Sequence, residues 1–179
     1  KYANHPKIKI LRRENREGYK GGALKEAIKQ TDPRTEFIIV YDADFVPAPG
    51  SIKSFLKEFF IQNGNTFSLD KDKNLAAVQG YQWHVLNKDE NFVTSGIRFG
   101  FSGGYMIERT AQQYLGAMKM IAGSVFIIRR DVLEKFSWQM DNGYTSIVED
   151  WNLTIRMYIA GWKIGYTPDI KVPSECVNS

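Results

Sequence analysis

The pair of carboxylates Asp42 and Asp44 is the feature of this sequence best suited to chemistry. The pair follows the apolar run of residues 37–41, which is typical of a strand covered on both faces, and precedes Pro47 and Pro49. Two like charges repel, and a divalent cation that prefers oxygen ligands relieves this repulsion. Residues two apart on a strand lie about 6.6 Å apart along it, so both carboxylates reach one ion only if the chain turns. The pattern predicts a turn that binds Mg²⁺ or Mn²⁺, with an acidic surface turn as the alternative.

A second acidic group, Glu149-Asp150, lies near the start of a helix predicted over about residues 147–160. Ser146 and Glu149 have the spacing of a capping box, which gives Glu149 a structural explanation. Asp150 falls one residue beyond this box, at the positive end of the helix dipole. A carboxylate in that position, within reach of a substrate hydroxyl, is able to act as a general base.

Two glycine-containing segments could bring the backbone close to a ligand. Lys20-Gly21-Gly22 leads into a helix predicted over residues 20–30, and the N–H groups at a helix start favour phosphate. Its spacing is not that of a phosphate-binding loop, so a simple turn is the alternative. Residues 120–124 form a small-residue turn before a predicted strand, which indicates either tight packing or room for a ligand.

The elements that must position these residues alternate between strands and helices. The predicted strands are residues 7–11, 37–41, 75–82, 125–128 and 162–166, and the predicted helices are residues 20–30, 51–62, 106–118, a short one from residue 131, and 147–160. Gly96, Gly100, Gly103 and Gly104 are expected to interrupt any longer helix between residues 87 and 120. The alternation predicts an α/β fold with a mostly parallel central sheet flanked by helices. With 179 residues and no internal repeat, one domain is expected.

Composition argues against several other classes of protein. The single cysteine, Cys176, excludes an internal disulfide, and only two histidines argue against a histidine-built metal site. The net charge of +4 is spread without a block of like charges, so no nucleic-acid partner is expected. The longest uncharged stretch, residues 74–87, is too short and too polar to cross a bilayer.

Two metal-dependent phosphate chemistries fit the Asp42-Asp44 pair taken alone. The pattern D-x-D-x-V after a hydrophobic strand resembles phosphohydrolases of the haloacid dehalogenase superfamily, in which Asp42 would be the nucleophile and Asp44 the acid/base. D-x-D after a buried strand also resembles nucleotide-sugar glycosyltransferases of the GT-A fold. No serine- or threonine-ended strand with a catalytic lysine completes the phosphohydrolase set, and the surrounding motifs favour the glycosyltransferases.

Taken in order, the motifs resemble the family 2 glycosyltransferases, the inverting GT-A enzymes that include cellulose, chitin and hyaluronan synthases. The resemblance covers about residues 12–175 and rests on Lys20-Gly21-Gly22-Ala23-Leu24, Asp42-Ala43-Asp44, Val78-Gln79, Gly123-Ser124, Arg129-Arg130, Val148-Glu149-Asp150, Leu153, Arg156, Gly161-Trp162-Lys163 and Tyr166. It implies a metal-assisted transfer of sugar from a nucleoside-diphosphate sugar, expected to be a UDP-sugar, to a hydroxyl of a saccharide acceptor.

On the donor side, the resemblance implies roles for three residues. Asp44 would be the direct ligand of Mg²⁺ or Mn²⁺, Asp42 would contact the metal or the ribose, and Lys20 would lie near the nucleotide. Residues 1–90 would form the donor and metal half of the domain. The strand-loop-helix unit that grips the base in this family would precede Lys1, so the chain is expected to be a catalytic domain without that unit.

On the acceptor side, formed by residues 91–179, Asp150 would take the proton from the attacking hydroxyl. The residues implied to border the acceptor sugar are Ala122, Gly123, Ser124 and Glu149. One or two of six aromatic residues are expected at the acceptor cleft and the rest in the core: Tyr81, Trp83, Tyr105, Trp138, Tyr144 and Trp151.

The sequence also departs from the family pattern. Val148 stands where the family commonly has threonine, and the Gln-x-x-Arg-Trp motif of processive members does not occur before Ser179. An inactive carbohydrate-binding fragment is therefore the non-enzymatic alternative. The resemblance further implies a location at the cytosolic face of a membrane, with membrane contact only through segments outside this chain.

Overall fold

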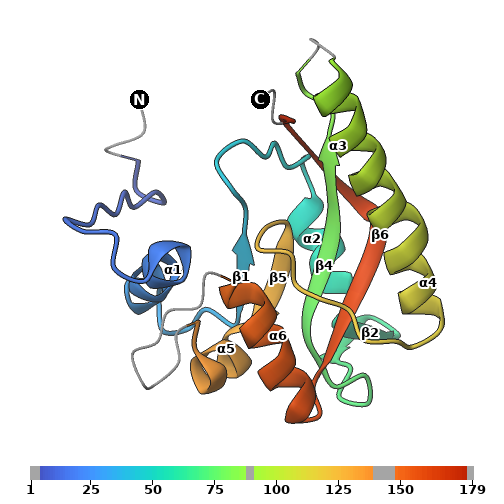
Figure 1. The fold of residues 1–179 in the computed structure, drawn as a ribbon. Helices are drawn as coiled ribbons and strands as arrows, with labels where there is room; N and C mark the ends of the chain where they lie inside the picture. The colour runs from blue at the N-terminus through green and yellow to red at the C-terminus, as the bar shows by residue number, and fades with distance from the viewer. Residues whose placement is uncertain (1–4, 88–90, 139–147, 177–179) are drawn as a thin grey trace.

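The computed structural model describes residues 5–87, 91–138 and 148–176, and it has the predicted α/β architecture with a central sheet between helices (Figure 1). The sheet contains four strands in the order β1-β5-β4-β6. Their bounds are Phe37–Val40 for β1, Leu75–His84 for β4, Phe126–Arg129 for β5 and Lys163–Ser174 for β6. The α/β class and the single central sheet are thus confirmed.

The direction of β5 distinguishes this sheet from a uniformly parallel one. β4 and β6 pair in parallel, whereas β5 is antiparallel to both β1 and β4. Three strands therefore run in one direction and β5 runs against them, so the sheet is mostly parallel in direction but mixed in pairing. The chain enters β5 beside the end of β1, where Phe126 pairs with Val40. From that edge of the sheet β5 runs back along β1 toward Phe37, and it is therefore antiparallel to β1.

Two layers of side chains cover β5, as its apolar sequence predicts. Phe126 and Ile128 face a cluster that contains Leu153 and Met157 of α6, whereas Ile127 faces Phe55 of α2 on the other side. Burial of one such side chain contributes roughly 1.5–3 kcal/mol. The first face is covered by α1 (Tyr19–Lys29), α5 (Arg130–Phe136) and α6 (Glu149–Ile159), and the second by α2 (Ser51–Lys57) and the hairpin of β2 (Phe60–Asn63) and β3 (Thr66–Leu69).

A long helical rod lies along β4 and β6 at one side of the molecule (Figure 1). It consists of α3 (Phe92–Ser102), a π-helical segment η1 (Gly103–Glu108) and α4 (Arg109–Tyr114). The expectation that glycines interrupt a helix here was wrong for Gly96 and Gly100, which lie inside α3, whereas Gly103 and Gly104 begin the π-helical segment. Each glycine costs about 1 kcal/mol relative to alanine, but packing of buried Tyr105 against Tyr81 and Tyr166, together with the reciprocal cap between Asn91 and Thr94, holds the rod together.

Three local predictions were also wrong. Residues 7–11 form no strand and are exposed, because their alternation finds no partner strand among the described residues. The helix predicted to residue 62 ends at Lys57, since Gly64-Asn65 is the two-residue loop of a hairpin and not the end of a helix. β6 extends to Ser174 instead of ending near residue 166. Among the helices in the described ranges, none combines the length and the apolar character needed to cross a membrane.

Candidate active site

The chain turns immediately after β1, as the sequence predicts. The carbonyl of Asp42 accepts a hydrogen bond from the Phe45 N–H at 3.2 Å, which closes a turn over residues 42–45. The Asp42 N–H donates to Ser124 Oγ at 2.8 Å and ties this corner to the segment before β5. Asp44 is exposed and makes no hydrogen bond or ion pair with the described residues. We call Lys20, Asp42 and Asp44 the donor corner.

Lys20 belongs to the first turn of α1, and its ammonium group pairs with Asp42. The Nζ–Oδ1 distance is 2.5 Å, and the two side chains are 34% and 43% exposed. The helix already includes Gly21 and Gly22, so these glycines are not a loop before it. Their smallness serves the protein's own packing: a Cβ on Gly22 would lie 2.3 Å from the Glu17 carbonyl oxygen.

Gly123 is the point at which the donor corner and Asp150 meet. Its φ of +69° is in the left-handed region that favours glycine. A Cβ at this position would lie 3.3 Å from Asp150 Oδ2 and 3.6 Å from Lys20 Nζ. The sum of these two distances, 6.9 Å, is the largest separation that Lys20 Nζ and Asp150 Oδ2 can have. Groups from α1, the end of β1 and the start of α6 therefore converge around one glycine.

The start of α6 differs from the predicted capping box. Val148 is the N-cap without a side-chain hydrogen bond, so Glu149 is the first helical residue and cannot act at the third position; Ser146 lies outside the described residues. Glu149 instead packs against α1, since a Cβ on Gly21 would lie 3.5 Å from its Cβ and Cγ. Asp150 Oδ1 accepts a hydrogen bond from the Trp151 N–H at 2.8 Å, which orients the carboxylate.

Two buried glutamines of β4 hold the turn that contains Gly123. Gln79 Oε1 accepts from the Ala122 N–H at 2.8 Å, and its Nε2 donates to the Ser124 carbonyl at 2.9 Å. Gln82 Nε2 donates to the carbonyls of Ala122 at 2.8 Å and Ser124 at 2.9 Å. We call residues 122–125 the clamped turn. Sequence reasoning included Gln79 in a motif but assigned it no role; a glutamine within an otherwise apolar strand is the signal for one.

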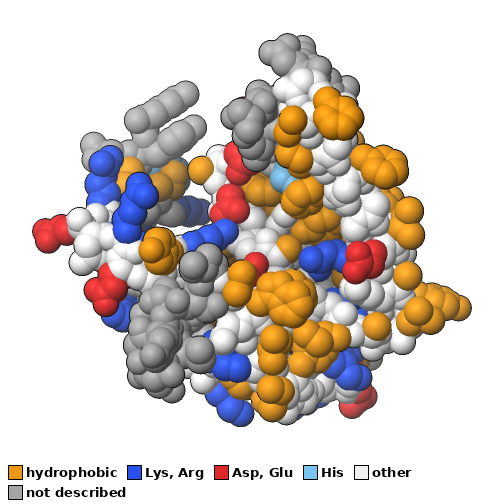
Figure 2. All heavy atoms as spheres, viewed as in Figure 1, with side chains coloured by type: hydrophobic (Ala, Val, Ile, Leu, Met, Phe, Trp, Pro, Cys, Tyr) orange, Lys and Arg blue, Asp and Glu red, His pale blue; other side chains and the backbone are white. Residues whose placement is uncertain are grey.

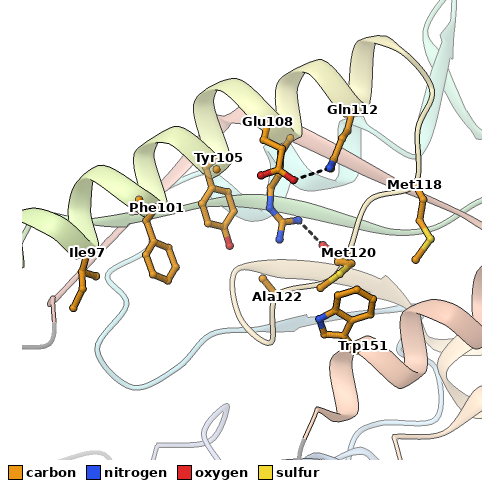
Figure 3. A pocket seen from close by; sticks show the side chains of 12 residues that line it. Ile97, Phe101, Tyr105, Glu108, Gln112, Met118, Met120, Ala122 and Trp151 are labelled. Atoms are coloured by element: carbon orange, nitrogen blue, oxygen red, sulfur yellow. Dashed lines mark hydrogen bonds between the residues drawn. The ribbon is translucent and has the colours of Figure 1, made fainter.

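A groove of about 740 Å³ opens beside the clamped turn (Figure 3). Its walls come from the helical rod, from the segment before the turn and from α6, and its lining residues are Ile97, Gly100, Phe101, Gly104, Tyr105, Glu108, Arg109, Gln112, Met118, Met120, Ala122 and Trp151. Arg109 Nη1 donates to the Met120 carbonyl at 2.6 Å and joins the two walls. Figure 2 shows hydrophobic side chains gathered along the rod on this face and charged groups near its centre.

The aromatic candidates differ in where they lie relative to the groove. Tyr105 and Trp151 line the groove, whereas Tyr81 and Trp138 are buried in the core. Trp83 is partly exposed and away from the groove lining, and Tyr144 lies outside the described residues. Arg109, Met118 and Met120 were not predicted as site residues, because only the packing of the rod brings them to the turn.

The residues of the donor corner suit a divalent cation that completes its shell with water and phosphate. Within residues 5–87, 91–138 and 148–176, no group of three or more His, Cys, Asp or Glu side chains could hold a metal ion. Mg²⁺ commonly uses only one or two carboxylates together with substrate phosphates. Asp44, which has no partner in the part of the chain that the structure describes, fits that use better than Asp42, whose charge Lys20 already balances.

Comparison with known proteins shows the family to which the sequence belongs. The sequence model of "Glycosyltransferase like family 2" matches residues 2–176. Glucomannan 4-beta-mannosyltransferase 2 of Arabidopsis thaliana is 30% identical over 169 residues, which are 94% of this chain and 29% of that protein. Glucomannan 4-beta-mannosyltransferase 1 of Oryza sativa subsp. japonica is 30% identical over 164 residues, 91% of this chain and 29% of that protein. The chain thus spans less than a third of the length of these relatives. Because the family match extends over nearly the whole sequence, the predicted resemblance is confirmed and this chain belongs to the family 2 glycosyltransferases.

Proposed function

We propose that this site transfers a hexosyl group from a nucleoside-diphosphate sugar, with a UDP-sugar as the first candidate, to a hydroxyl of a saccharide acceptor. The observation that carries the proposal is the convergence of the Lys20–Asp42 pair and Asp150 around Gly123. The donor corner, whose charges suit a diphosphate, and Asp150, whose carboxylate can accept a proton, both come within a few ångströms of Gly123. Membership of the family removes the phosphohydrolase alternative.

The donor corner supplies electrostatic stabilisation. Lys20 directs a positive charge toward the diphosphate, and Asp44 with Asp42 would hold Mg²⁺ or Mn²⁺. When bound, this cation would stabilise the negative charge on the departing diphosphate. Because the Lys20–Asp42 pair is partly exposed, its net contribution to folding is small, and its partners can be exchanged at little cost when a donor binds.

Asp150 acts on the acceptor as general base. It takes the proton from the acceptor hydroxyl while that oxygen forms a bond to the anomeric carbon, and the bond from this carbon to the diphosphate oxygen breaks on the opposite face. The result is inversion at the anomeric carbon. The hydrogen bond from the Trp151 N–H to Oδ1 leaves Oδ2, the oxygen nearest Gly123, available for the proton. The role of Asp150 therefore consists of positioning the acceptor hydroxyl and accepting one proton from it.

The names of the relatives suggest the first substrates to test, namely mannosyl donors and β-1,4-linked mannan oligosaccharides. The intact protein would be incubated with labelled UDP-hexoses and GDP-mannose, with mannotetraose as acceptor, in Mn²⁺ or in EDTA. We expect Mn²⁺-dependent label in lengthened oligosaccharides and a β-linkage in the product. Transfer with retained configuration would contradict the mechanism, and donor binding without any transfer would favour an inactive carbohydrate-binding fragment.

A further inference from the structure

The hydroxyl of Tyr105 is a buried polar group that has no hydrogen-bond partner among the described residues. The residue is 3% exposed and lines the groove, and its Oη is buried. Buried polar side-chain atoms nearly always have a partner, so each exception calls for an explanation. Burial raises the pKa of this phenol well above its usual range, against the opposing effect of Arg109. The hydroxyl therefore remains protonated near neutral pH and is available as a hydrogen-bond donor.

The ring that carries this hydroxyl is held by contacts on several sides. Tyr81 stacks on it with ring centres 5.3 Å apart, and the Arg109 guanidinium lies 4.8 Å from its centre. The Tyr105 carbonyl accepts a hydrogen bond from Tyr166 Oη at 2.6 Å. Tyr105 also belongs to η1, and π-helical segments within α-helices frequently occur at functional sites. These contacts fix the orientation of the Tyr105 ring and therefore the direction of its hydroxyl.

The Tyr105 hydroxyl points toward the clamped turn beside the groove. Figure 3 shows the Tyr105 ring extending from the helical rod toward Ala122, with Trp151 on the opposite wall. Ala122 packs against the same aromatic cluster as Tyr105. The charge of Asp150 also raises the pKa of Tyr105, after the larger effect of burial. The unpaired hydroxyl is therefore directed at the turn whose Gly123 lies close to Asp150, the carboxylate assigned as base.

The groove lining is mainly apolar and contains a few polar groups, a composition that can accept the apolar face of a sugar ring. The Trp151 ring offers a flat apolar surface, and Arg109 and Glu108 contribute polar groups along the wall. Sites of this composition bind ligands that have apolar faces and a few fixed polar atoms, as sugars do. A hydrocarbon chain in the same groove would leave the Tyr105 hydroxyl without a partner.

We propose that the Tyr105 hydroxyl is a specificity-determining group that donates a hydrogen bond to the acceptor saccharide next to the hydroxyl that reacts. The proposal rests on the proposed function, because it takes the groove beside Asp150 as the acceptor site. Tyr105 would recognise the acceptor and take no part in donor binding or in the proton transfer.

The test compares Tyr105→Phe with Tyr166→Phe in the intact protein. The two variants each remove one phenolic oxygen from the same aromatic cluster, but of the two hydroxyls only that of Tyr166 has a hydrogen-bond partner among the residues described. With mannotetraose as acceptor at saturating donor, we expect Tyr105→Phe to raise the acceptor KM about tenfold, the effect of one lost hydrogen bond. UDP affinity in Mn²⁺ and the melting temperature should not fall. Tyr166→Phe should lower the melting temperature and leave the acceptor KM within twofold.

Two results would overturn the inference while leaving the proposed function intact. The first is an unchanged acceptor KM in Tyr105→Phe alongside normal transfer by the wild type. The second is a fall in melting temperature as large as that of Tyr166→Phe, which would give the hydroxyl a structural partner. If the wild type binds UDP but transfers to no saccharide, the proposed function fails, and the inference fails with it.

Discussion

The donor corner and the clamped turn are in contact, through the hydrogen bond from the Asp42 N–H to Ser124 Oγ, but are built in opposite ways. In the donor corner, charged side chains are partly or fully exposed, and one ion pair joins Lys20 to Asp42. In the clamped turn, Gln79 and Gln82 are buried, and they engage the backbone of Ala122 and Ser124 from the neighbouring strand. One region can exchange its partners for a diphosphate and a cation, whereas the other cannot move without losing buried hydrogen bonds.

Because of this contrast, substitutions in the two regions should have different effects, on ligand binding in one and on folding stability in the other. An exposed ion pair contributes about 0–1 kcal/mol to folding, so changes in the donor corner should alter ligand binding and leave the fold intact. A buried polar group that loses its partner costs about 1–3 kcal/mol, so changes in the clamped turn should destabilise the protein. Asp150 lies at the junction, and Gly123 is the backbone position that brings both regions within reach of it.

Asp150→Asn is expected to have the largest effect, on transfer alone. Loss of a general base lowers the rate by roughly 10²–10⁴-fold. Because the amide keeps the shape of the side chain, the affinity for UDP in Mn²⁺ should remain within twofold. Steady-state rates and calorimetric titration of UDP would measure the two quantities. An equal loss of both would remove Asp150 from the role of base and place it in donor binding.

Gln79→Leu should have the next largest effect, on stability. The change leaves the Ala122 N–H without the Gln79 acceptor and removes one donor from the Ser124 and Val125 carbonyls, at a cost of about 1–3 kcal/mol. Thermal or urea denaturation would measure this cost. Gln62→Leu is the matched control, since Gln62 is exposed and bonds only to the carbonyl of nearby Gly64. A loss of stability no larger than in this control would show that the clamp does not hold the turn.

Asp44→Asn should weaken Mn²⁺-dependent UDP binding about tenfold, the effect of losing one charged ligand, or about 1.4 kcal/mol. The comparison with Asp42→Asn sharpens this prediction, because Lys20 already balances the charge of Asp42 and the loss there should be smaller. Titrations with and without Mn²⁺ would separate the metal-dependent part. If Asp42→Asn has the larger effect, the direct metal ligand has been assigned to the wrong carboxylate.

Gly123→Ala should have the smallest of these effects, a loss of stability of about 1 kcal/mol, because the left-handed backbone disfavours a Cβ. The methyl group would also stand 3.3 Å from Asp150 Oδ2, a close contact that should lower kcat more than the affinity for UDP. Gly116→Ala is a useful control, with φ of +67° and nothing within 4 Å of the added Cβ. Equal kcat in the two variants would show that the space beside Asp150 is not needed for transfer.

Patterns of apolar residues in the sequence predicted several strands and helices of the fold. The continuous apolar runs of β1, β4 and β5 and the helical periodicity of α1 were confirmed at nearly the expected residues. The reversal of β5 was not predicted, because strand direction depends on where the chain enters the sheet. Glycine content misled the prediction of the helical rod, since packing of Tyr105 outweighs the cost of the glycines.

The sequence predicted the charged residues of the candidate site but not the residues that position them. The sequence singled out Asp42 and Asp150 by motif and by their places after a strand and at a helix start. The hydrogen bonds of Gln79 to residues 43–46 positions away depend on the pairing of β4 with β5, which no local pattern encodes. The unpaired hydroxyl of Tyr105 likewise becomes visible only when its surroundings are known.

The most direct test of the shared site is a crystal structure of the intact protein with UDP and Mn²⁺. We predict Mn²⁺ bound by Asp44 and by diphosphate oxygens, Lys20 beside the same diphosphate, and Asp150 facing it across the space left open by Gly123. A diphosphate bound away from Asp44, or separated from Asp150 by packed side chains, would contradict the single-cleft arrangement and the transfer mechanism built on it.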